Sequence, residues 1–236
     1  MFKIALNAGH YYYEPGRRVS KQFDANETRE WVLNSRVCQR VEEKLKKYSG
    51  YSLLRIDDAT GETLIKLADR IKKANDFDAD IYVSVHHNAG IYGESGGGIM
   101  AFVYPNVDDY TKRCQKLLYD KLIEKTSLKG NRATPLATAD FYELRETKMP
   151  AVLLECGFMD SSVDAPIIIT ESFSDACAEA IVEALVELGN LKIAEVPEQS
   201  DKLYRVQVGA FKVKQNAINL QNKLKAAGFD AIIKED

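Results

Sequence analysis

Histidine side chains occur at two points where buried strands are predicted to end. The sequence holds only three histidines, and His10 lies three residues beyond a strand predicted over residues 3–7. His86 and His87 directly follow a second predicted strand, over residues 81–85. In open α/β sheets, the loops at the carboxyl ends of the strands build the binding site. Two strand ends that both carry imidazole predict one metal centre, although each histidine could instead cap a loop or pack passively.

A zinc hydrolase site needs about three protein ligands and one open position for water, so the two histidine positions leave one ligand to find. A carboxylate is the usual third ligand. The sequence has no HExxH motif, which excludes the common metalloprotease helix. Glu27 and Glu30 stand at the start of the helix predicted after the His10 loop. They are three residues apart and share a helical face, so spacing alone does not choose between them.

Glu155 ends an otherwise apolar strand predicted over residues 151–155. An unpaired carboxylate in apolar surroundings is costly, so it needs a partner, a metal ion or a raised pKa. Such surroundings are typical of a general acid or base. The alternative is a strand-end glutamate whose side chain reaches solvent.

The elements that must position these groups alternate between strands and amphipathic helices. This alternation predicts a three-layer α/β/α domain with a mainly parallel twisted sheet. The predicted strands cover residues 3–7, 52–56, 81–85, 99–104, 141–144 and 151–155, and the predicted helices cover about 28–48, 62–76, 108–126 and 171–188.

The composition changes after this domain. We expect a polar linker over residues 191–202, followed by a small βαβ unit over residues 203–236. Its strands are predicted over 204–208 and 230–234, around a helix over 216–226. A unit this small rarely buries enough apolar surface to be stable alone, so it must pack against something.

Residues 1–190 resemble the zinc-dependent N-acetylmuramoyl-L-alanine amidases of the Amidase_3 family. Any one matching segment alone would be weak, but together they are specific. The segments are Asn7-Ala8-Gly9-His10, Glu30 with Asn34, Arg70 to Ala74, Ser84-Val85-His86-His87-Asn88-Ala89, Gly97-Gly98-Ile99, Leu144-Arg145, and Met149 to Phe158.

The resemblance implies a Zn²⁺ ion bound by His10, Glu30 and His86, with Glu155 as the catalytic carboxylate. It favours Glu30 over Glu27 because Asn34 matches the family register. The segment over residues 11–26 departs from the usual Gly-rich loop, and its three tyrosines either shape substrate access or pack together.

Three further residues are predicted to bind substrate: His87, Asn88 and Arg145. His87 stands where the family usually has a small residue, so it could line the pocket or replace His86 as a ligand.

The implied reaction is hydrolysis of the amide between N-acetylmuramic acid and the L-alanine of the peptidoglycan stem peptide. In it, zinc polarises the carbonyl and acidifies water, while Glu155 moves a proton from that water to the leaving nitrogen. One alternative is a zinc peptidase that acts on stem peptides or cross-links. Another is a wall-binding module with a degenerate zinc site.

The tail over residues 203–236 resembles one half of a SPOR-type peptidoglycan-binding module, in Tyr204 to Phe211 and Ala226 to Phe229. The family module consists of two βαβ halves that share a sheet. One half alone would leave a strand edge exposed, which predicts a homodimer through residues 203–236. The alternative is that the half-module docks on its own catalytic domain.

Charge and hydropathy exclude two classes of partner. The net charge of −3 argues against nucleic acid, and no apolar run approaches the roughly 20 residues that span a membrane. The first residues lack the apolar core of a signal peptide, which predicts cytoplasmic synthesis and action on the cell wall after holin-type or lytic release. We therefore expect a phage endolysin, with a mother-cell autolysin as the alternative.

The cysteines are widely spaced and form no CxxC pair, which predicts reduced thiols in a core. They are Cys38, Cys114, Cys156 and Cys177.

Overall fold

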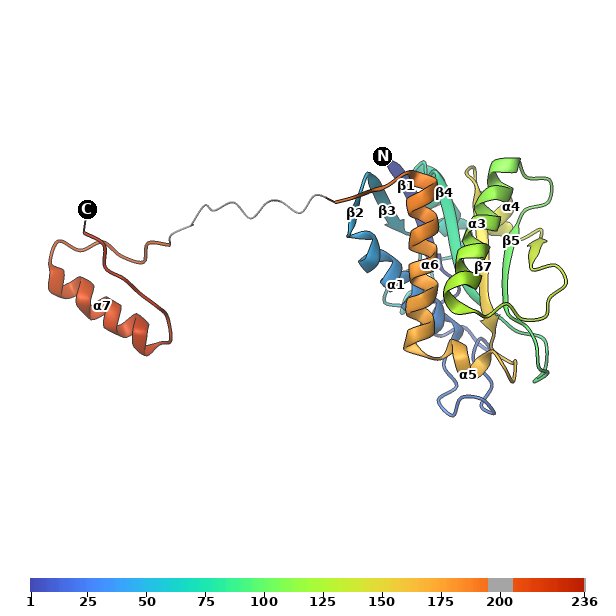
Figure 1. Cartoon of the computed structure of the whole chain (residues 1–236), viewed down its shortest axis with the longest axis horizontal. Helices are drawn as coiled ribbons and strands as arrows, with labels where there is room; N and C mark the ends of the chain where they lie inside the picture. Colours follow the sequence, from blue (N-terminus) through green and yellow to red (C-terminus); the bar gives the residue numbers. More distant parts are fainter. Residues whose placement is uncertain (195–205, 236) are drawn as a thin grey trace. The chain divides into compact units, whose positions relative to one another are not determined.

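The computed structural model describes residues 1–194 and 206–235, and the chain divides into two compact units, Met1–Glu195 and Val196–Asp236. The second unit contains α7 (Lys214–Ala226). The elements of the first unit, shown in Figure 1, are β1 (Phe2–Ala8), α1 (Glu30–Leu45), β2 (Tyr48–Ser49), β3 (Tyr51–Arg55), α2 (Leu67–Asp76), β4 (Ile81–Asn88), β5 (Ile99–Val103), α3 (Asp109–Thr126), β6 (Leu136–Thr138), α4 (Tyr142–Arg145), β7 (Ala151–Phe158), α5 (Ala165–Ile168), α6 (Glu171–Gly189) and β8 (Lys192–Ile193).

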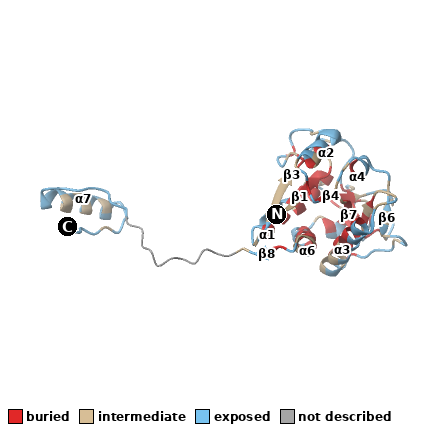
Figure 2. Cartoon of the chain, turned by 90° about the horizontal axis from the view of Figure 1, so that it is seen from above, coloured by how far each residue is buried: buried red, intermediate tan, exposed pale blue. Residues whose placement is uncertain are grey.

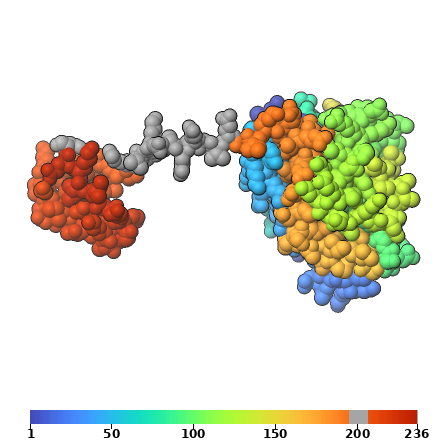
Figure 3. Space-filling model, viewed as in Figure 1, coloured from blue at the N-terminus to red at the C-terminus, as the bar shows by residue number. Residues whose placement is uncertain are grey.

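The first unit is built on a six-stranded sheet with the strand order β3-β1-β4-β7-β5-β6. Every neighbouring pair is parallel except β5 and β7, which are antiparallel. Helices α1, α6 and α3 lie side by side over one face (Figure 1), and Figure 3 shows the continuous outer surface of this side of the unit, whereas α2 and α4 cover the other face. The predicted three-layer fold with a mainly parallel sheet is confirmed.

A hydrophobic cluster lies on each face of this sheet, because successive residues of a strand point to opposite sides. Val83 and Val85 belong to the larger cluster, under α1, α3 and α6. Tyr82 and Leu153 belong to the smaller cluster, which includes residues of α2 and α4. Figure 2 shows these central strands as the buried interior of the unit. The alternation places His86, four residues after Tyr82, on the same face as Tyr82.

The strands that carry the candidate site are longer than predicted. Strand β4 runs to Asn88 and β7 runs to Phe158, so His86, His87 and Glu155 lie within strands rather than after or at the end of them. The extra pairs form because β4 and β7 continue to bond to each other beyond Val85, with His86 opposite Glu155.

Two other predicted elements also differ. The strand predicted over residues 141–144 is wrong, because helix α4 occupies Tyr142–Arg145. Here two exposed aromatic residues precede two buried residues, a pattern that lacks the alternation of a strand. Helix α2 begins at Leu67 rather than near residue 62.

The start of the predicted linker belongs to the first unit. Strand β8, at residues 192–193, pairs antiparallel with β2, so the chain leaves the folded unit later than residue 191. The remainder of that linker, residues 195–202, lies outside the described residues.

The C-terminal unit shows a helix without the predicted strands. Between residues 206 and 235 the structure contains α7 but no strand, so the βαβ expectation is wrong for this described range; residues 204–205 lie outside it. A strand needs a neighbouring strand to satisfy its backbone N–H and C=O groups, and residues 206–235 contain no such pair. No residue of α7 is buried, as the colours of this helix in Figure 2 show. Val206, Phe229 and Ile232 are exposed.

All four cysteines are buried and free, as predicted.

Across the part of the chain that the structure describes, no helix combines the length and the apolar character that crossing a bilayer requires.

Candidate metal centre

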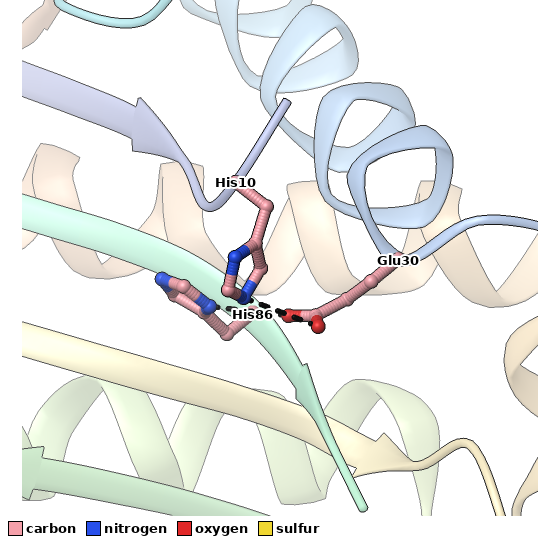
Figure 4. Close-up of side chains that lie close together, drawn as sticks. All are labelled: His10, Glu30 and His86. Carbon is pink, nitrogen blue, oxygen red and sulfur yellow. Dashed lines mark hydrogen bonds and ion pairs between the residues drawn. The ribbon is translucent and has the colours of Figure 1, made fainter. Parts of the chain in front are cut away.

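Three side chains from separate elements converge at the carboxyl edge of the sheet (Figure 4). His10 follows β1, Glu30 begins α1 and His86 lies on β4. Their potential ligand atoms all lie within 4.8 Å of one another. His10 Nε2 is 3.2 Å from Glu30 Oε2, and His86 Nδ1 is 3.1 Å from Glu30 Oε1. The structure thus brings together the three residues that the resemblance names as zinc ligands.

These three residues fit a zinc ion. Two ligands that are each about 2.0–2.1 Å from a tetrahedral ion are about 3.3 Å apart, close to the separations observed here. Glu30 Oε2 is buried and has no hydrogen-bond partner, a state that is rare unless an ion or water completes it. Two imidazoles and one carboxylate are also an established donor set for catalytic zinc.

The loop that carries His10 is held in an unusual backbone conformation. His10 has a φ of 65°, in the left-handed region, and the Arg70 guanidinium fixes this turn. Arg70 donates to the Ala8 carbonyl at 2.8 Å, and it also donates to the His10 carbonyl. It is itself buried, so its charge is satisfied by these carbonyl groups.

Gly9 allows the two histidines to approach each other. A β-carbon added at Gly9 would lie 2.0 Å from Cε1 of His86, a distance that no packed structure tolerates. The rings of His10 and His86 meet edge to face, with centroids 5.0 Å apart. The glycine before His10 is therefore required by close packing against the His86 ring.

Asn34 holds Glu30 from behind, one helical turn along α1. Its Nδ2 donates to the Gly9 carbonyl at 3.2 Å and to Glu30 Oε1 at 3.4 Å. The backbone N–H of His87 also donates to Glu30 Oε1, at 3.3 Å. One carboxylate oxygen of Glu30 is thus held in place while the other faces His10.

The pKa of Glu30 suits a metal ligand. Burial raises the pKa of Glu30, but the adjacent imidazoles of His10 and His86 outweigh this effect and hold the pKa well below its ordinary value. Burial alone would lower the pKa of His86, whereas Glu143 and Glu30 raise it well above the ordinary value. Glu30 is therefore ionised at neutral pH, as a metal ligand must be.

Glu155 lies beside this cluster, directly opposite His86 in the parallel β4–β7 pair. Its Oε2 is buried and has no hydrogen-bond partner. Burial raises the pKa of Glu155 to about 8; His86 opposes this shift, while Glu30 and Glu143 add to it. A carboxyl group that can gain or lose a proton near neutral pH, next to a candidate metal site, suits a general acid or base.

His87 lies on the opposite side of β4 from His86 and is only 2% exposed. Its Nδ1 is 2.7 Å from Asn34 Oδ1, and burial lowers its pKa to about 3. The imidazole therefore stays neutral and supports Asn34 within the fold.

The other two predicted substrate-binding residues are Asn88, at the end of β4, and Arg145, at the end of α4. The side chain of Asn88 accepts a hydrogen bond from the backbone N–H of Ala89 at 2.8 Å. Arg145 has a 38% exposed side chain that pairs with Asp140 and Glu146. Their contact with substrate stays a prediction, as does that of His87.

Glu27, the alternative ligand, points elsewhere. Its backbone has a φ of 48°, and its carboxylate lies 3.5 Å from Arg18 Nη1 at the surface. The turn before α1 separates Glu27 from Glu30, so the two do not share a helical face as the spacing predicted.

Sequence reasoning missed two carboxylates that face the histidines. Glu14 Oε2 is 3.0 Å from His10 Nδ1, and Glu143 Oε1 is 3.6 Å from His86 Nε2. Glu14 lies in the loop that departs from the family pattern, and Glu143 lies in the segment wrongly predicted as a strand. A helical assignment of residues 142–145 would have placed Glu143 and Leu144 on the buried side.

Comparison with known protein families is consistent with this geometry. Residues 4–187 match the Amidase_3 family, described as N-acetylmuramoyl-L-alanine amidase, and residues 176–235 match the SPOR domain. The chain is 34% identical over 236 residues to the sporulation-specific N-acetylmuramoyl-L-alanine amidase of Bacillus subtilis (strain 168), covering 99% of this chain and 84% of that protein. It is 30% identical over 202 residues to the endolysin of Bacillus phage SPP1, covering 84% of this chain and 71% of the endolysin.

Solved structures resemble the first unit. The N-acetylmuramoyl-L-alanine amidase of Clostridium difficile 630 superposes with a TM-score of 0.69 and 26% identity, covering 80% of this chain and 97% of that one. The catalytic domain of CwlV from Bacillus (Paenibacillus) polymyxa var. colistinus superposes with a TM-score of 0.70 and 22% identity, covering 81% of this chain and 100% of that one. This second likeness shows that the two proteins share the fold. The family match covers most of the chain and includes all three converging side chains, so this protein belongs to the N-acetylmuramoyl-L-alanine amidase family, Amidase_3.

Proposed function

We propose that the protein hydrolyses the amide bond between N-acetylmuramic acid and the L-alanine of the peptidoglycan stem peptide. The observation that carries this proposal is the convergence of His10, Glu30 and His86 beside a buried carboxyl group in a chain of the amidase family. We assign zinc binding to these three residues and the catalytic role to Glu155. When bound there, zinc supplies a Lewis acid that polarises the scissile carbonyl and acidifies water.

Glu155 is the proton carrier in this proposal. Its carboxylate accepts a proton from the water that attacks the carbonyl carbon and then donates that proton to the departing L-alanine nitrogen. One group performs both steps because its raised pKa, about 8 without a metal, allows both protonation states near neutrality. The C–N bond breaks as the nitrogen gains the proton, which leaves a free carboxylate on the lactyl group and a free amine on the peptide.

Product analysis tests the reaction. Purified peptidoglycan digested with the protein should release new L-alanine amino termini and leave glycan strands intact. A zinc peptidase that acts on stem peptides or cross-links would instead leave every muramyl amide whole. Chelation of the metal should stop the release, and re-addition of zinc should restore it. Peptide-internal amino termini as the sole product would contradict the amidase assignment.

We assign wall binding to residues 203–236 and catalysis to residues 1–190. The SPOR match supports the first assignment, and Val206, Phe211 and Phe229 expose apolar side chains within the described range. These side chains also support the proposed homodimer, because burying them would stabilise a unit in which no residue between 206 and 235 is buried. Light scattering of the full chain at micromolar concentration tests the dimer, and a monomer would contradict it.

The biological role stays a proposal. We infer that the protein acts on the cell wall after holin-type or lytic release, as an endolysin, with a mother-cell autolysin as the alternative. One relative named as an endolysin and one named as a sporulation-specific amidase both match this chain. Expression of the gene on prophage induction would support the first role, and expression confined to sporulation would support the second.

A further inference from the structure

A third buried carboxylate, Glu143, lies behind the His86 ring. Glu143 comes from helix α4, and its Oε1 lies 3.6 Å from His86 Nε2. At the other nitrogen of the same ring, Nδ1 is 3.1 Å from Glu30 Oε1. The imidazole of His86 is therefore flanked by two carboxylates, one at each ring nitrogen, and only Glu30 belongs to the proposed metal site.

Glu143 is held firmly by its own contacts. The Tyr82 hydroxyl donates to Glu143 Oε2 at 2.6 Å, and Tyr82 is fully buried. The Thr147 hydroxyl donates to the Glu143 carbonyl at 3.0 Å and so fixes the end of α4. Because Tyr82 and His86 are four residues apart on β4, they project to the same face of the sheet. One oxygen of Glu143 is thus used by Tyr82, and the other remains for His86.

The Nε2 atom of His86 needs this acceptor. It is buried and has no hydrogen-bond partner, because 3.6 Å exceeds the length of a hydrogen bond. A buried ring N–H that stays unpaired is costly, and a shift of a few tenths of an ångström would close the contact with Glu143. We propose that Glu143 is a positioning residue: it accepts a hydrogen bond from His86 Nε2–H and thereby directs the unprotonated Nδ1 towards the metal.

The physical reason is the choice between two tautomers. A neutral imidazole carries one proton, and a carboxylate at Nε2 keeps it there, leaving the lone pair on Nδ1. A carboxylate behind a metal-binding histidine also fixes the ring orientation and raises the basicity of the ligand. His10 has a similar partner in Glu14, at 3.0 Å, but the Glu14 side chain is 33% exposed, whereas that of Glu143 is 8% exposed. Solvent screens the Glu14 contact more strongly, so Glu143 should have the larger effect.

Zinc affinity measured by competition with a chelator tests this role, which rests on the proposed metal site. Glu143→Gln keeps the size of the side chain and a group that can pair with Tyr82, but it removes the charge that faces His86. We expect its zinc dissociation constant to rise about 10- to 100-fold, the usual cost of losing such a partner. Tyr82→Phe is the matched control, because it removes the 2.6 Å hydrogen bond and leaves the carboxylate. Its dissociation constant should rise no more than about threefold, well below that cost.

The tautomer of His86 supplies a second measurement on the unmodified protein. Long-range proton–nitrogen correlation spectra of the zinc-loaded full chain should show His86 protonated at Nε2 and coordinated through Nδ1. This result does not depend on whether the Glu143 variant folds. Coordination through Nε2, or zinc affinity of a folded Glu143→Gln protein within about threefold of the parent, would overturn the proposal.

The same experiment separates this inference from the proposed function. If the parent protein binds no zinc, the metal site itself is wrong and both proposals fail. If the parent binds zinc and Glu143→Gln binds it equally well, only the role of Glu143 fails.

Discussion

Glu30 and Glu155 are two carboxylates near the same imidazole, yet their surroundings act in opposite directions. Glu30 is in close contact with the imidazoles of two histidines, which lower its pKa far below the ordinary range despite burial. Glu155 is half-buried, but its Oε2 is buried without a hydrogen-bond donor, and its pKa rises to about 8. Paired groups whose pKa values are driven apart take different roles in catalysis. In the proposed function, this contrast assigns Glu30 to hold a cation and Glu155 to carry a proton.

The largest expected effect comes from replacing Glu30, the proposed zinc ligand. Glu30→Gln should lose stoichiometric zinc and reduce turnover of peptidoglycan by about 10⁴-fold or more, since a bound metal contributes several kcal/mol to catalysis. Metal analysis of the purified protein and amino-terminus release from wall measure the two effects. Glu27→Gln is the matched control, because Glu27 pairs with Arg18 at the surface, and it should keep both properties. Retention of tight zinc by the Glu30 variant would remove Glu30 from the ligand set.

Replacing Glu155, the proposed proton carrier, should separate zinc binding from turnover. Glu155→Gln should keep zinc at one ion per chain but lose about 10²- to 10⁴-fold in turnover, the range for one general acid–base group. The measurement is the rate of amino-terminus release at saturating wall, beside a metal analysis of the same sample. Full turnover in this variant would show that another group moves the proton.

Zinc should stabilise the protein only where Glu30 is intact. At about 100 times its dissociation constant, a ligand of the folded state adds about 2.7 kcal/mol to the free energy of unfolding. We expect this gain in the parent and in Glu155→Gln, and its loss in Glu30→Gln. Denaturant unfolding with and without zinc measures it; a gain in the Glu30 variant equal to that of the parent would break the contrast.

For each unit of pH, the smallest expected effect is the pH dependence of stability without metal. The pKa of Glu155 rises from 4.5 to about 8 on folding, so between these values the unfolded state has released the proton while the folded state keeps it. The free energy of unfolding therefore falls by about 1.4 kcal/mol per pH unit from this group, and Glu155→Gln avoids that loss. For Glu30 the sign reverses, because its lowered pKa stabilises the folded state above pH 4.5, and this stabilisation disappears as the pH falls through the folded-state pKa.

Unfolding of the chelated proteins near pH 3, near pH 5 and near pH 8 tests both signs. The advantage of Glu155→Gln over the parent should grow between pH 5 and pH 8, whereas the deficit of Glu30→Gln should shrink between pH 5 and pH 3. An advantage of Glu155→Gln that does not change with pH would show that Glu155 is ionised in the folded protein.

Much of the fold followed from the sequence because hydrophobic periodicity reports local geometry. The apolar stripe of α1 predicted a helix, and the continuous apolar run of β4 predicted a buried strand. Periodicity could not show where β4 stops, because residues 86–88 are polar and are strand only through pairing with β7. It failed at residues 141–144 for a similar reason: a short aromatic run does not distinguish a strand from one helical turn.

The candidate site also combines features that the sequence determined with features that only the tertiary structure decided. The sequence by itself determined which chemical groups are present and that His10 and His86 lie near the carboxyl ends of parallel strands, because strand polarity follows from the alternation of strands and helices. It also determined the family through motifs read in order, and this resemblance favoured Glu30 over Glu27. Only the tertiary structure directed Glu27 to Arg18 at the surface, placed His87 on the far face of β4, and brought Glu14 and Glu143 behind the histidine rings. These outcomes depend on backbone turns and contacts between residues far apart in the chain, which no local pattern encodes.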